Sequence, residues 1–411
     1  MAARDDVAAR GVTAEEITSV VRAEHGRVVA ALVRRFADID LAEDALGEAL
    51  LVAAESWPAQ GMPANPGGWL TTTATRKAID RIRRESTRQQ RHEQAMLVHA
   101  PAPPPLTGPV EDDRLRLVFT CCHPALAPEA RIALTLRLLG GLTVAEIASA
   151  FLVSEKTMAQ RLTRAKRKIR EARVPYRVPA AEDLPERLSG VLTTLYLVFN
   201  EGYLSSGDQA ADRPDLTAEA VRLTRTLRGL MPEEPEVSGL LAMMLLTEAR
   251  RPARLVDGVL VPLGEQDRAL WDTALLQEGL DLVRECLRVN RPGQFQLLAA
   301  TNAVHADAPT AADTDWSQVL ALYDHLMQVA PTPVVALNRA VAVAEVAGPA
   351  AGLALVDGLD LTAYAPLHVA RAELLQRLGR SAEARAAYDT ALSLTDNPAE
   401  RALLQRKRAQ D

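Results

Sequence analysis

Residues 142–170 have the sequence LTVAEIASAFLVSEKTMAQRLTRAKRKIR, which has the pattern of two short helices joined by a turn. Thr143 and Glu146 fit a Thr-x-x-Glu capping box, in which each side chain bonds the backbone N–H of the other residue at a helix start. Ser154 is of the residue type that caps a second helix. This order of capping signals predicts a helix-turn-helix.

The second helix of this motif has two different faces. One face is apolar, because its residues recur at spacings of four, three and four: Met158, Leu162, Ala165 and Ile169. The opposite face carries Lys156, Gln160, Thr163 and Arg167. Residues 154–173 hold eight basic and two acidic residues, which favours contact with DNA. The alternative is an amphipathic surface helix whose charged side is only solvated.

The composition favours a folded, all-α protein of several domains. The chain has 411 residues, of which 48% are hydrophobic, 24% are charged and only 4% are aromatic. Ala and Leu abound, and few β-branched runs lie between turn signals. No window reaches the roughly eighteen uninterrupted apolar residues of a membrane span, and the first ten residues lack an apolar signal core. We therefore expect a cytoplasmic protein without membrane contact.

The net charge of −6 conceals an asymmetry along the chain. Residues 1–178 hold 26 basic and 21 acidic residues, a balance of +5, whereas the remainder holds 21 basic and 32 acidic residues, a balance of −11. A basic front half and an acidic rear half fit a nucleic-acid-binding module joined to a part that does not bind nucleic acid.

Three cysteines are too few for a disulfide framework, which favours a reducing compartment. Cys121, Cys122 and His123 are adjacent, but no second Cys or His pair lies nearby in the sequence to complete a zinc site. We interpret the thiols as buried or semi-buried and predict no metal; metal or redox sensing is the alternative.

The segment from residue 41 to residue 56 has the pattern of a helix with a core stripe made of Leu46, Ala49, Leu50 and Ala53. Its other side has acidic residues around an apolar centre: Asp44, Glu48 and Glu55 around Leu51. This surface resembles a protein-docking face. A plainly solvated acidic face is the alternative.

Residues 56–85 begin with a Pro- and Gly-rich loop flanked by Trp57 and Trp69 and continue into another helix. Its packing stripe is expected to contain Leu70, Ala74, Ala78 and Ile82. Residues 76–91 hold seven basic and two acidic residues. Basic side chains bind phosphates, and a loop beside aromatic residues can hold an unstacked base.

The segment APAPPPLTGPV, within residues 92–113, cannot form a helix and predicts a spacer between the two basic helices. Two small DNA-contacting domains on such a tether can engage two separated sites at once, which increases avidity.

This arrangement resembles the extracytoplasmic-function (ECF) sigma factors of bacterial RNA polymerase, which consist of two helical domains, regions 2 and 4, joined by a flexible linker. The resemblance covers roughly residues 15–175. The motifs DLAEDALGEALLVAAESWP and NPGGWLTTTATRKAIDRIRRE are similar to the two halves of region 2, and LGGLTVAEIASAFLVSEKTMAQRLTRAKRKIR is similar to region 4.

The resemblance implies two partners, core RNA polymerase and promoter DNA, and a role for particular residues. Those implied to bind the polymerase are Asp44, Glu48 and Leu51. Those implied to recognise the −10 element are Asn65, Trp69, Thr73, Arg76, Arg81 and Arg84. Those implied to read the −35 element in the major groove are Lys156, Thr157, Gln160, Arg161 and Arg164.

Two positions weaken the correspondence with the family. Many relatives have Gln where this chain has Gly47, and Gly costs about 1 kcal/mol in a helix interior. Arg81 falls near the packing stripe of its helix, so its assignment to DNA is less direct than that of Arg76 or Arg84.

The chain continues far beyond region 4 and contains the stretches VLTTLYLVFNEGYLSSGD (191–208), LGEQDRALWDTALLQEG (263–279) and FQLLAATNAVHADA (295–308). These stretches resemble the sigma-factor subgroup with a large C-terminal extension related to tetratricopeptide (TPR) repeats. Six residues have the relative spacing of one such repeat: Ala372, Leu375, Gly379, Ala384, Tyr388 and Ala391. A weaker copy begins near Ala340, and a generic helical bundle is the alternative. The expected domains are region 2 in 1–95, the linker in 96–113, region 4 in 114–177 and a TPR-like extension in 178–411.

The sequence thus predicts a non-enzymatic transcription initiation factor without a cofactor, whose extension contacts the sigma domains and regulates them in cis. Polar clusters in the extension, FNEGY at 199–203 and EQDRALWD at 265–272, lack a phosphate loop, nucleophile elbow or metal-ligand spacing. We interpret them as polar residues that fix helix packing. The alternative functions are a polymerase-independent helix-turn-helix repressor and a ligand-sensing regulator.

Overall fold

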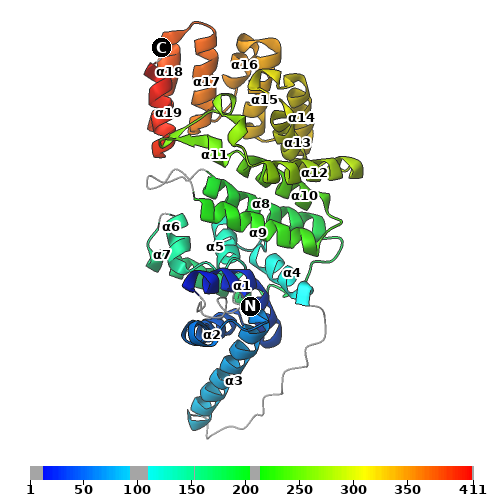
Figure 1. The fold of residues 1–411 in the computed structure, drawn as a ribbon, viewed down its shortest axis with the longest axis vertical. Helices are drawn as coiled ribbons and strands as arrows, with labels where there is room; N and C mark the ends of the chain where they lie inside the picture. The colour runs from blue at the N-terminus through cyan, green and yellow to red at the C-terminus, as the bar shows by residue number, and fades with distance from the viewer. Residues whose placement is uncertain (1–12, 93–109, 152, 204–212, 410–411) are drawn as a thin grey trace, which may run out of the picture. The chain divides into compact units, whose positions relative to one another are not determined.

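The computed structural model describes residues 13–92, 110–151, 153–203 and 213–409. In this part of the chain, nineteen α-helices and one two-stranded hairpin confirm the predicted all-α fold class (Figure 1). The chain divides into two compact units, Met1–Thr194 and Leu195–Asp411, and the division falls within helix α8 (Leu184–Tyr203). Each unit is described by itself.

The first unit contains, before α8, the helices α1 (Ala14–Phe36), α2 (Ile39–Gln60), α3 (Pro66–His92), α4 (Val110–Cys121), α5 (Pro128–Leu138), α6 (Val144–Ala150) and α7 (Glu155–Glu171). Local signals set several of the helix ends. Thr13 and Glu16 form a capping box at α1, and Asp38 accepts the backbone N–H of Leu41 at 3.0 Å to start α2. Between them Ala37 adopts a left-handed conformation that ends α1.

Helices α1, α2 and α3 pack on one another. The predicted stripe of α2 is buried at Leu46, Ala49 and Ala53, whereas Leu50 is half-buried. Trp57 is buried at the end of α2, and its ring meets that of Trp69 edge-on, with centroids 5.4 Å apart. These contacts hold the start of α3 against the end of α2.

The predicted stripe of α3 is confirmed at Leu70, Ala74 and Ala78 but is wrong at Ile82, whose side chain is 42% exposed. The later turns of α3 extend away from α1 and α2, so a residue at the right helical spacing finds nothing to pack against (Figure 1).

Helix α4 begins at Val110, so its first four residues lie within the segment 96–113 that is predicted as linker. Asp113 in this first turn is buried between two cations: it lies 3.1 Å from Arg34 of α1 and 2.8 Å from Arg116 of α4. The rest of the predicted linker, with its Pro-rich stretch up to residue 109, lies outside the described residues.

The second unit contains, after α8, the helices α9 (Pro214–Leu230), α10 (Pro235–Glu248), α11 (Arg251–Arg254), α12 (Thr273–Val289), α13 (Gln294–Asp307), α14 (Trp316–Val329), α15 (Pro333–Ala347), α16 (Pro349–Val356), α17 (Ala365–Arg377), α18 (Ser381–Ser393) and α19 (Pro398–Ala409). The strands β1 (Leu255–Val256) and β2 (Val259–Leu260) pair antiparallel, and three 3-10 turns span Leu263–Glu265, Arg268–Leu270 and Ala311–Asp313. Several helices begin at a proline, which lacks the N–H that a first helical turn leaves unbonded.

Helix α10 is apolar on every side and is the most buried helix of the second unit. It packs against α9, α12 and α13. Its neighbour α12 comes close because Gly279 lacks a side chain: an added Cβ would lie 2.7 Å from Cγ of Leu246. From α12 to α19 each helix packs on the next one along the chain, and α10 packs on both α12 and α13.

Candidate functional site

Both predicted capping signals of the helix-turn-helix are present. The backbone N–H of Thr143 donates to Oε2 of Glu146 at 2.7 Å, and the backbone N–H of Glu146 donates to Oγ1 of Thr143 at 3.1 Å. The backbone N–H of Thr157 donates to Oγ of Ser154 at 3.2 Å and starts α7. The sequence therefore specified the start of both helices through contacts three residues apart.

Helix α7 has the two predicted faces. Its apolar residues are buried: Met158, Leu162, Ala165 and Ile169. Of the five residues predicted for −35 recognition, Lys156, Gln160 and Arg164 are exposed, and Thr157 and Arg161 are half-buried. Thr157 also takes part in the cap, because its hydroxyl lies 2.9 Å from that of Ser154. The three exposed residues of this set are two cations and one amide, the donor types that suit phosphates and base edges.

The acidic side of α2 is exposed around Leu51, but its carboxylates are not free. Leu51 is 66% exposed, far more than is usual for a large apolar side chain. Asp44 forms an ion pair of 2.7 Å with Arg81 of α3, and Glu48 lies 3.7 Å from Lys77. One predicted polymerase-binding residue and one predicted DNA-binding residue therefore contact each other.

The residues predicted for the −10 element lie along α3. Asn65 caps the helix, with Oδ1 accepting the backbone N–H of Gly68 at 2.9 Å. Trp69 and Thr73 are half-buried, whereas Arg76 and Arg84 are exposed. Asn65, Trp69, Thr73 and Arg76 follow one another at spacings of four, four and three, which places them on one side of the helix.

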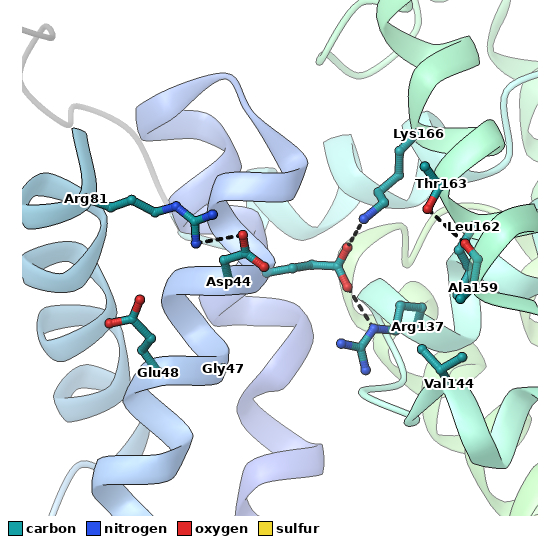
Figure 2. Close-up of a pocket in the computed structure, with 11 residues that line it drawn as sticks. Asp44, Gly47, Glu48, Arg81, Arg137, Val144, Ala159, Leu162, Thr163 and Lys166 are labelled. Carbon is teal, nitrogen blue, oxygen red and sulfur yellow. Dashed lines mark hydrogen bonds and ion pairs between the residues drawn. The ribbon is translucent and has the colours of Figure 1, made fainter. Parts of the chain in front are cut away.

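A polar cleft of about 440 Å³ lies between α2 and the helix-turn-helix (Figure 2). Glu43 of α2, which is 10% exposed, accepts hydrogen bonds from Nε of Arg137 at 2.7 Å and from Nζ of Lys166 at 2.9 Å. Asp40 binds Lys166 at 2.6 Å and Arg170 at 3.0 Å. Burial alone would lower the pKa of Lys166, but Glu43 and Asp40 outweigh burial and raise it.

Sequence reasoning missed this ion-pair cluster. Its partners are more than ninety residues apart in the chain, so no local pattern links them. One signal was present: Lys166 follows Leu162 by four residues and precedes Ile169 by three, so it borders the buried face of α7. A cation at such a border is placed to meet an acid on the packing partner.

Two further contacts hold α1 to the later helices of the first unit. Arg22 of α1 forms an ion pair with Glu146, the residue that caps α6. The hydroxyl of Tyr176 donates to the carbonyl of Ala30 at 2.9 Å or to that of Asp113 at 3.1 Å. Burial raises the pKa of Tyr176, so the phenol stays protonated.

The interpretation of the cysteines as buried thiols is confirmed. Cys121, Cys122 and Cys286 are all free and buried. Burial raises the pKa of Cys121 and Cys122, and it raises that of Cys286 to about 11. Buried thiols of raised pKa are poor nucleophiles and poor metal ligands.

The polar residues of the second unit hold helix ends and turns. Asp267 and Asp272 cap the 3-10 turn at Arg268 and helix α12, with N–H to carboxylate distances of 2.9–3.0 Å. Arg268 donates to the carbonyls of His305 and Ala308, each at 2.6 Å, and its guanidinium lies over the ring of Trp271. These contacts agree with the interpretation of the EQDRALWD cluster as a packing element.

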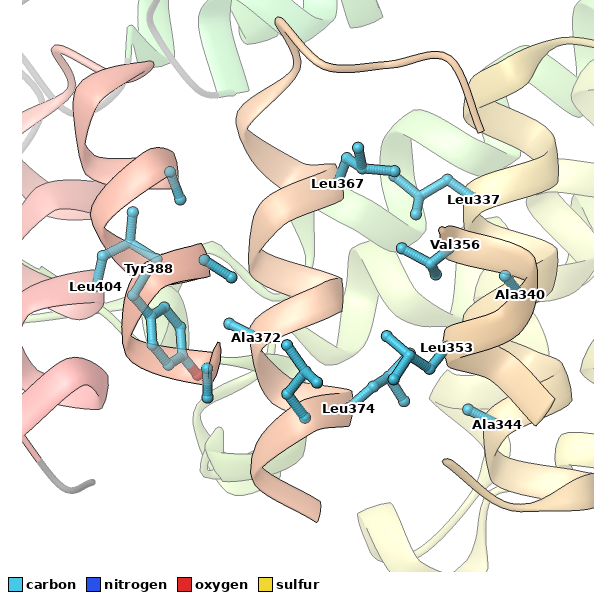
Figure 3. Packing of buried hydrophobic residues seen from close by; sticks show 14 residues of the cluster. Leu337, Ala340, Ala344, Leu353, Val356, Leu367, Ala372, Leu374, Tyr388 and Leu404 are labelled. Carbon is cyan, nitrogen blue, oxygen red and sulfur yellow. The ribbon is translucent and has the colours of Figure 1, made fainter. Parts of the chain in front are cut away.

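The helices α15 to α19 enclose one apolar core (Figure 3). Five of the six residues at repeat spacing are buried in it: Ala372, Leu375, Ala384, Tyr388 and Ala391. The sixth, Gly379, has a φ of 71° in the turn between α17 and α18, which favours glycine. In the weaker copy, an added Cβ at Gly352 would lie 2.4 Å from Cβ of Ala344, so α15 and α16 approach closely.

Sequence models of three families match separate segments of the chain. Sigma-70 region 2 matches residues 20–88, which contain most of α1, all of α2 and most of α3. Sigma-70 region 4 matches residues 116–169, which contain the helix-turn-helix. A family of unknown function, DUF6596, matches residues 187–287.

Two curated relatives are similar to the chain over different lengths. An uncharacterized protein of Rhizobium meliloti is 42% identical over 387 residues, which cover 92% of each chain. The probable ECF RNA polymerase sigma factor SigI of Mycobacterium tuberculosis is 28% identical over 175 residues, which cover 41% of this chain and 59% of SigI.

No solved structure matches the chain. Within the described residues, every helix is too short or too polar to cross a membrane. The two sigma-region matches, the likeness to SigI and the matched segment beyond them lead to one conclusion. The chain contains sigma-70 regions 2 and 4, is homologous to an ECF RNA polymerase sigma factor in that part, and continues beyond region 4 into a large helical extension.

Proposed function

We propose that this protein binds core RNA polymerase and directs it to specific promoters, without catalysis of its own. The observation that carries the proposal is the coincidence of region 2 and region 4 matches with two outward-facing surfaces, one on α2 and α3 and one on α7. Sigma regions 2 and 4 serve transcription initiation. The exposed side chains on α2, α3 and α7 are of the types that bind a protein partner and DNA.

The polymerase contact is proposed for the face of α2 that carries Asp44, Glu48 and Leu51. An exposed leucine ringed by carboxylates suits a partner surface with an apolar hollow and a basic rim, because apolar burial gives affinity and the rim gives orientation. Arg81 and Lys77 pair with the two carboxylates. Docking would then exchange these pairs for ion pairs with the polymerase.

The promoter contacts are proposed for two helices. On α3, Asn65, Trp69, Thr73, Arg76 and Arg84 would bind the −10 element, and Arg81 would join them only after leaving Asp44. On α7, Lys156, Thr157, Gln160, Arg161 and Arg164 would enter the major groove at the −35 element. Exposed arginines bind phosphate and guanine, and glutamine binds adenine through two hydrogen bonds.

Run-off transcription from a genomic promoter library with purified core polymerase tests the proposal. The wild type is compared with an Arg76→Ala/Arg84→Ala double variant and with Arg288→Ala, a matched control on an exposed arginine of α12. Promoter-specific transcripts that disappear only in the double variant would support a sigma factor with its −10 surface on α3. A wild-type protein that fails to bind core polymerase would overturn the proposal in favour of a polymerase-independent repressor.

For the second unit, we infer a TPR-like extension that regulates the sigma regions in cis, through contact with them. Stacked helical pairs with small residues at their contacts support the likeness to tetratricopeptide repeats. An acidic extension that covers basic helices would inhibit promoter binding and would be weakened by salt. An extension that braces regions 2 and 4 would activate.

A truncation after Thr194 distinguishes these two modes. The cut lies there, rather than at the predicted boundary of 178, because the start of α8 belongs to the first unit. Nη2 of Arg187 donates to the carbonyl of Phe119 at 2.7 Å, and Val191 is fully buried. Increased promoter-specific transcription from the truncated protein would indicate inhibition, and loss of transcription from a folded truncation would indicate bracing.

A further inference from the structure

A cavity of about 270 Å³ lies in the second unit beside the β-hairpin. Its lining includes Tyr203, Arg250, Arg254, Leu263, Gln266 and Leu403. The hairpin strand β2 packs on helix α19, which brings Leu403 to the cavity from the far end of the chain (Figure 1). The volume suits a small molecule of metabolite size.

The charged groups in the lining are all cationic. Arg250 precedes α11 and Arg254 ends it, and no carboxylate is among the described residues that line the cavity. Nε of Arg250 is buried without a hydrogen-bond partner, and no ion pair to its guanidinium is present in the described part of the chain. Arg250 as a whole is half-buried. A guanidinium that is partly withdrawn from water without a counter-charge is costly, so such groups in proteins are normally paired.

The second arginine is held in a fixed orientation. The guanidinium of Arg254 lies 3.7 Å from the centroid of the Tyr203 ring, and its Nη1 donates to the carbonyl of Tyr203. Gln266 is held by a bond of 3.0 Å from its Nε2 to the carbonyl of Val261, whereas its Oε1 is buried without a hydrogen-bond partner. The cavity therefore offers fixed donors together with one acceptor.

Neighbouring groups respond to this positive charge. Burial lowers the pKa of Arg250; Tyr203 opposes this shift, and the charge of Arg268 adds to it. Burial, followed by the charges of Arg250 and Arg268, lowers the pKa of His305 to about 4. Arg250 and Arg268 thus act on each other and on His305.

We infer that this cavity binds a small oxyanion, a carboxylate or phosphate group, through the guanidinium of Arg250. Guanidinium groups bind both anions through paired, charge-assisted hydrogen bonds. The ligand's anionic group would supply the counter-charge that Arg250 lacks, and a hydroxyl or amine of the ligand would donate to Oε1 of Gln266. Such a ligand would make the extension a chemical sensor, whichever way the extension acts on transcription.

Isothermal titration calorimetry of the full-length protein tests the site with two probes, sodium phosphate and sodium acetate. Each titration is carried out at constant ionic strength against sodium chloride, so that screening is the same throughout. Saturable binding of phosphate alone, or of acetate alone, supports the site and identifies the class of anion. Absence of saturable binding for both probes overturns the inference.

Three variants locate the binding. Arg250→Gln removes the cation, and we expect at least a tenfold loss of affinity for the bound probe. Arg288→Gln is the matched control on an exposed arginine of the same unit and should bind as the wild type does. An affinity of Arg250→Gln within threefold of the wild type would overturn the inference.

The third variant, Leu263→Trp, fills the cavity and keeps both arginines. If Arg250→Gln does not fold, the affinity of Leu263→Trp for the bound probe is measured instead. An affinity within threefold of the wild type would again overturn the inference. Thermal unfolding in sodium chloride alone gives a second readout, because a cation whose counter-charge comes from a ligand destabilises the ligand-free protein. We expect Arg250→Gln to have a midpoint equal to or above that of the wild type without a bound anion, whereas a purely structural arginine would lower the midpoint when removed.

Discussion

Nζ of Lys166 in helix α7 lies 2.9 Å from Oε2 of Glu43 in helix α2, and this ion pair joins region 4 to region 2. The same carboxylate also accepts a hydrogen bond from Arg137 of α5. One largely buried acid therefore links three helices, and the two sigma regions are held together through α2, the helix that carries the proposed polymerase-binding face.

Substitution of this acid is expected to destabilise the first unit. Glu43→Gln leaves Lys166 and Arg137 largely buried without a full counter-charge, so the free energy of unfolding should fall by about 2 kcal/mol. Chemical denaturation measures the change. Glu55→Gln, an exposed acid on the same helix, is the control and should alter stability by less than about 0.5 kcal/mol. Equal effects of the two substitutions would show that Glu43 contributes nothing beyond surface charge.

If α2 contacts the polymerase as proposed, Leu51 contributes to polymerase binding and not to the stability of the fold. Leu51→Asp should weaken binding to core polymerase at least tenfold, because it removes the apolar centre of the face, while the unfolding free energy stays nearly constant. Leu287→Asp is a close control, since Leu287 of α12 is 67% exposed against 66% for Leu51. Pull-down and titration with fluorescently labelled protein measure binding. Undiminished binding by Leu51→Asp would place the polymerase contact elsewhere.

Arg164 on the exposed side of α7 is expected to contribute to DNA affinity in a salt-dependent way. If it contacts phosphate, Arg164→Ala should make the plot of log Kd against log salt concentration less steep by about one. Fluorescence anisotropy of the holoenzyme on a promoter selected by run-off transcription measures this slope. Arg288→Ala should leave the slope as it is, and an unchanged slope for Arg164→Ala would remove that residue from the phosphate contacts.

Two helical glycines should respond in opposite ways to the same substitution. Gly47 of α2 has open space around its missing side chain, so Gly47→Ala should raise the free energy of unfolding by up to about 1 kcal/mol. A Cβ added at Gly352 of α16 would lie 2.4 Å from Cβ of Ala344, so Gly352→Ala should lower the free energy of unfolding by about 1–3 kcal/mol despite the same gain in helix propensity. Thermal and chemical unfolding distinguish the two, and a shared sign would contradict the packing described here.

The stability of the second unit should depend on pH through His305. Its pKa of about 4 in the folded protein lies below the ordinary 6.5, so folding favours the neutral ring. The stability linked to this lowered pKa is complete above pH 6.5. It is lost as the pH falls from 6.5 towards 4, because in that range the ring is protonated in the unfolded state but not yet in the folded state. At pH 5 the loss is about 2 kcal/mol.

Comparison of unfolding at pH 7.5 and pH 5.0 measures this loss. His305→Gln should reduce the difference between the two pH values, since the variant has no ring to protonate. A pH dependence that is the same in the wild type and the variant would assign the loss to other groups.

Much of the fold was predictable because helix signals are local. Thr143 with Glu146, and Ser154 with Thr157, act over three residues, and the apolar stripe of α7 follows from helical geometry. The ion pair of Asp113 with Arg34 could not be predicted, because the two residues are distant in sequence. Ile82 was misplaced, because periodicity gives the direction of a side chain but not whether anything lies there to cover it.

The sequence by itself determined the helices, their caps, their apolar faces and the resemblance to sigma regions 2 and 4, since each depends on residues a few positions apart. Only the tertiary structure decided which charges meet: Glu43 with Lys166, Asp44 with Arg81, and Arg250 with no described ion-pair partner beside a cavity. The reason is physical. Periodicity and capping are properties of one helix, whereas the pairing of a charge depends on which helix packs against it and on how much water that packing removes.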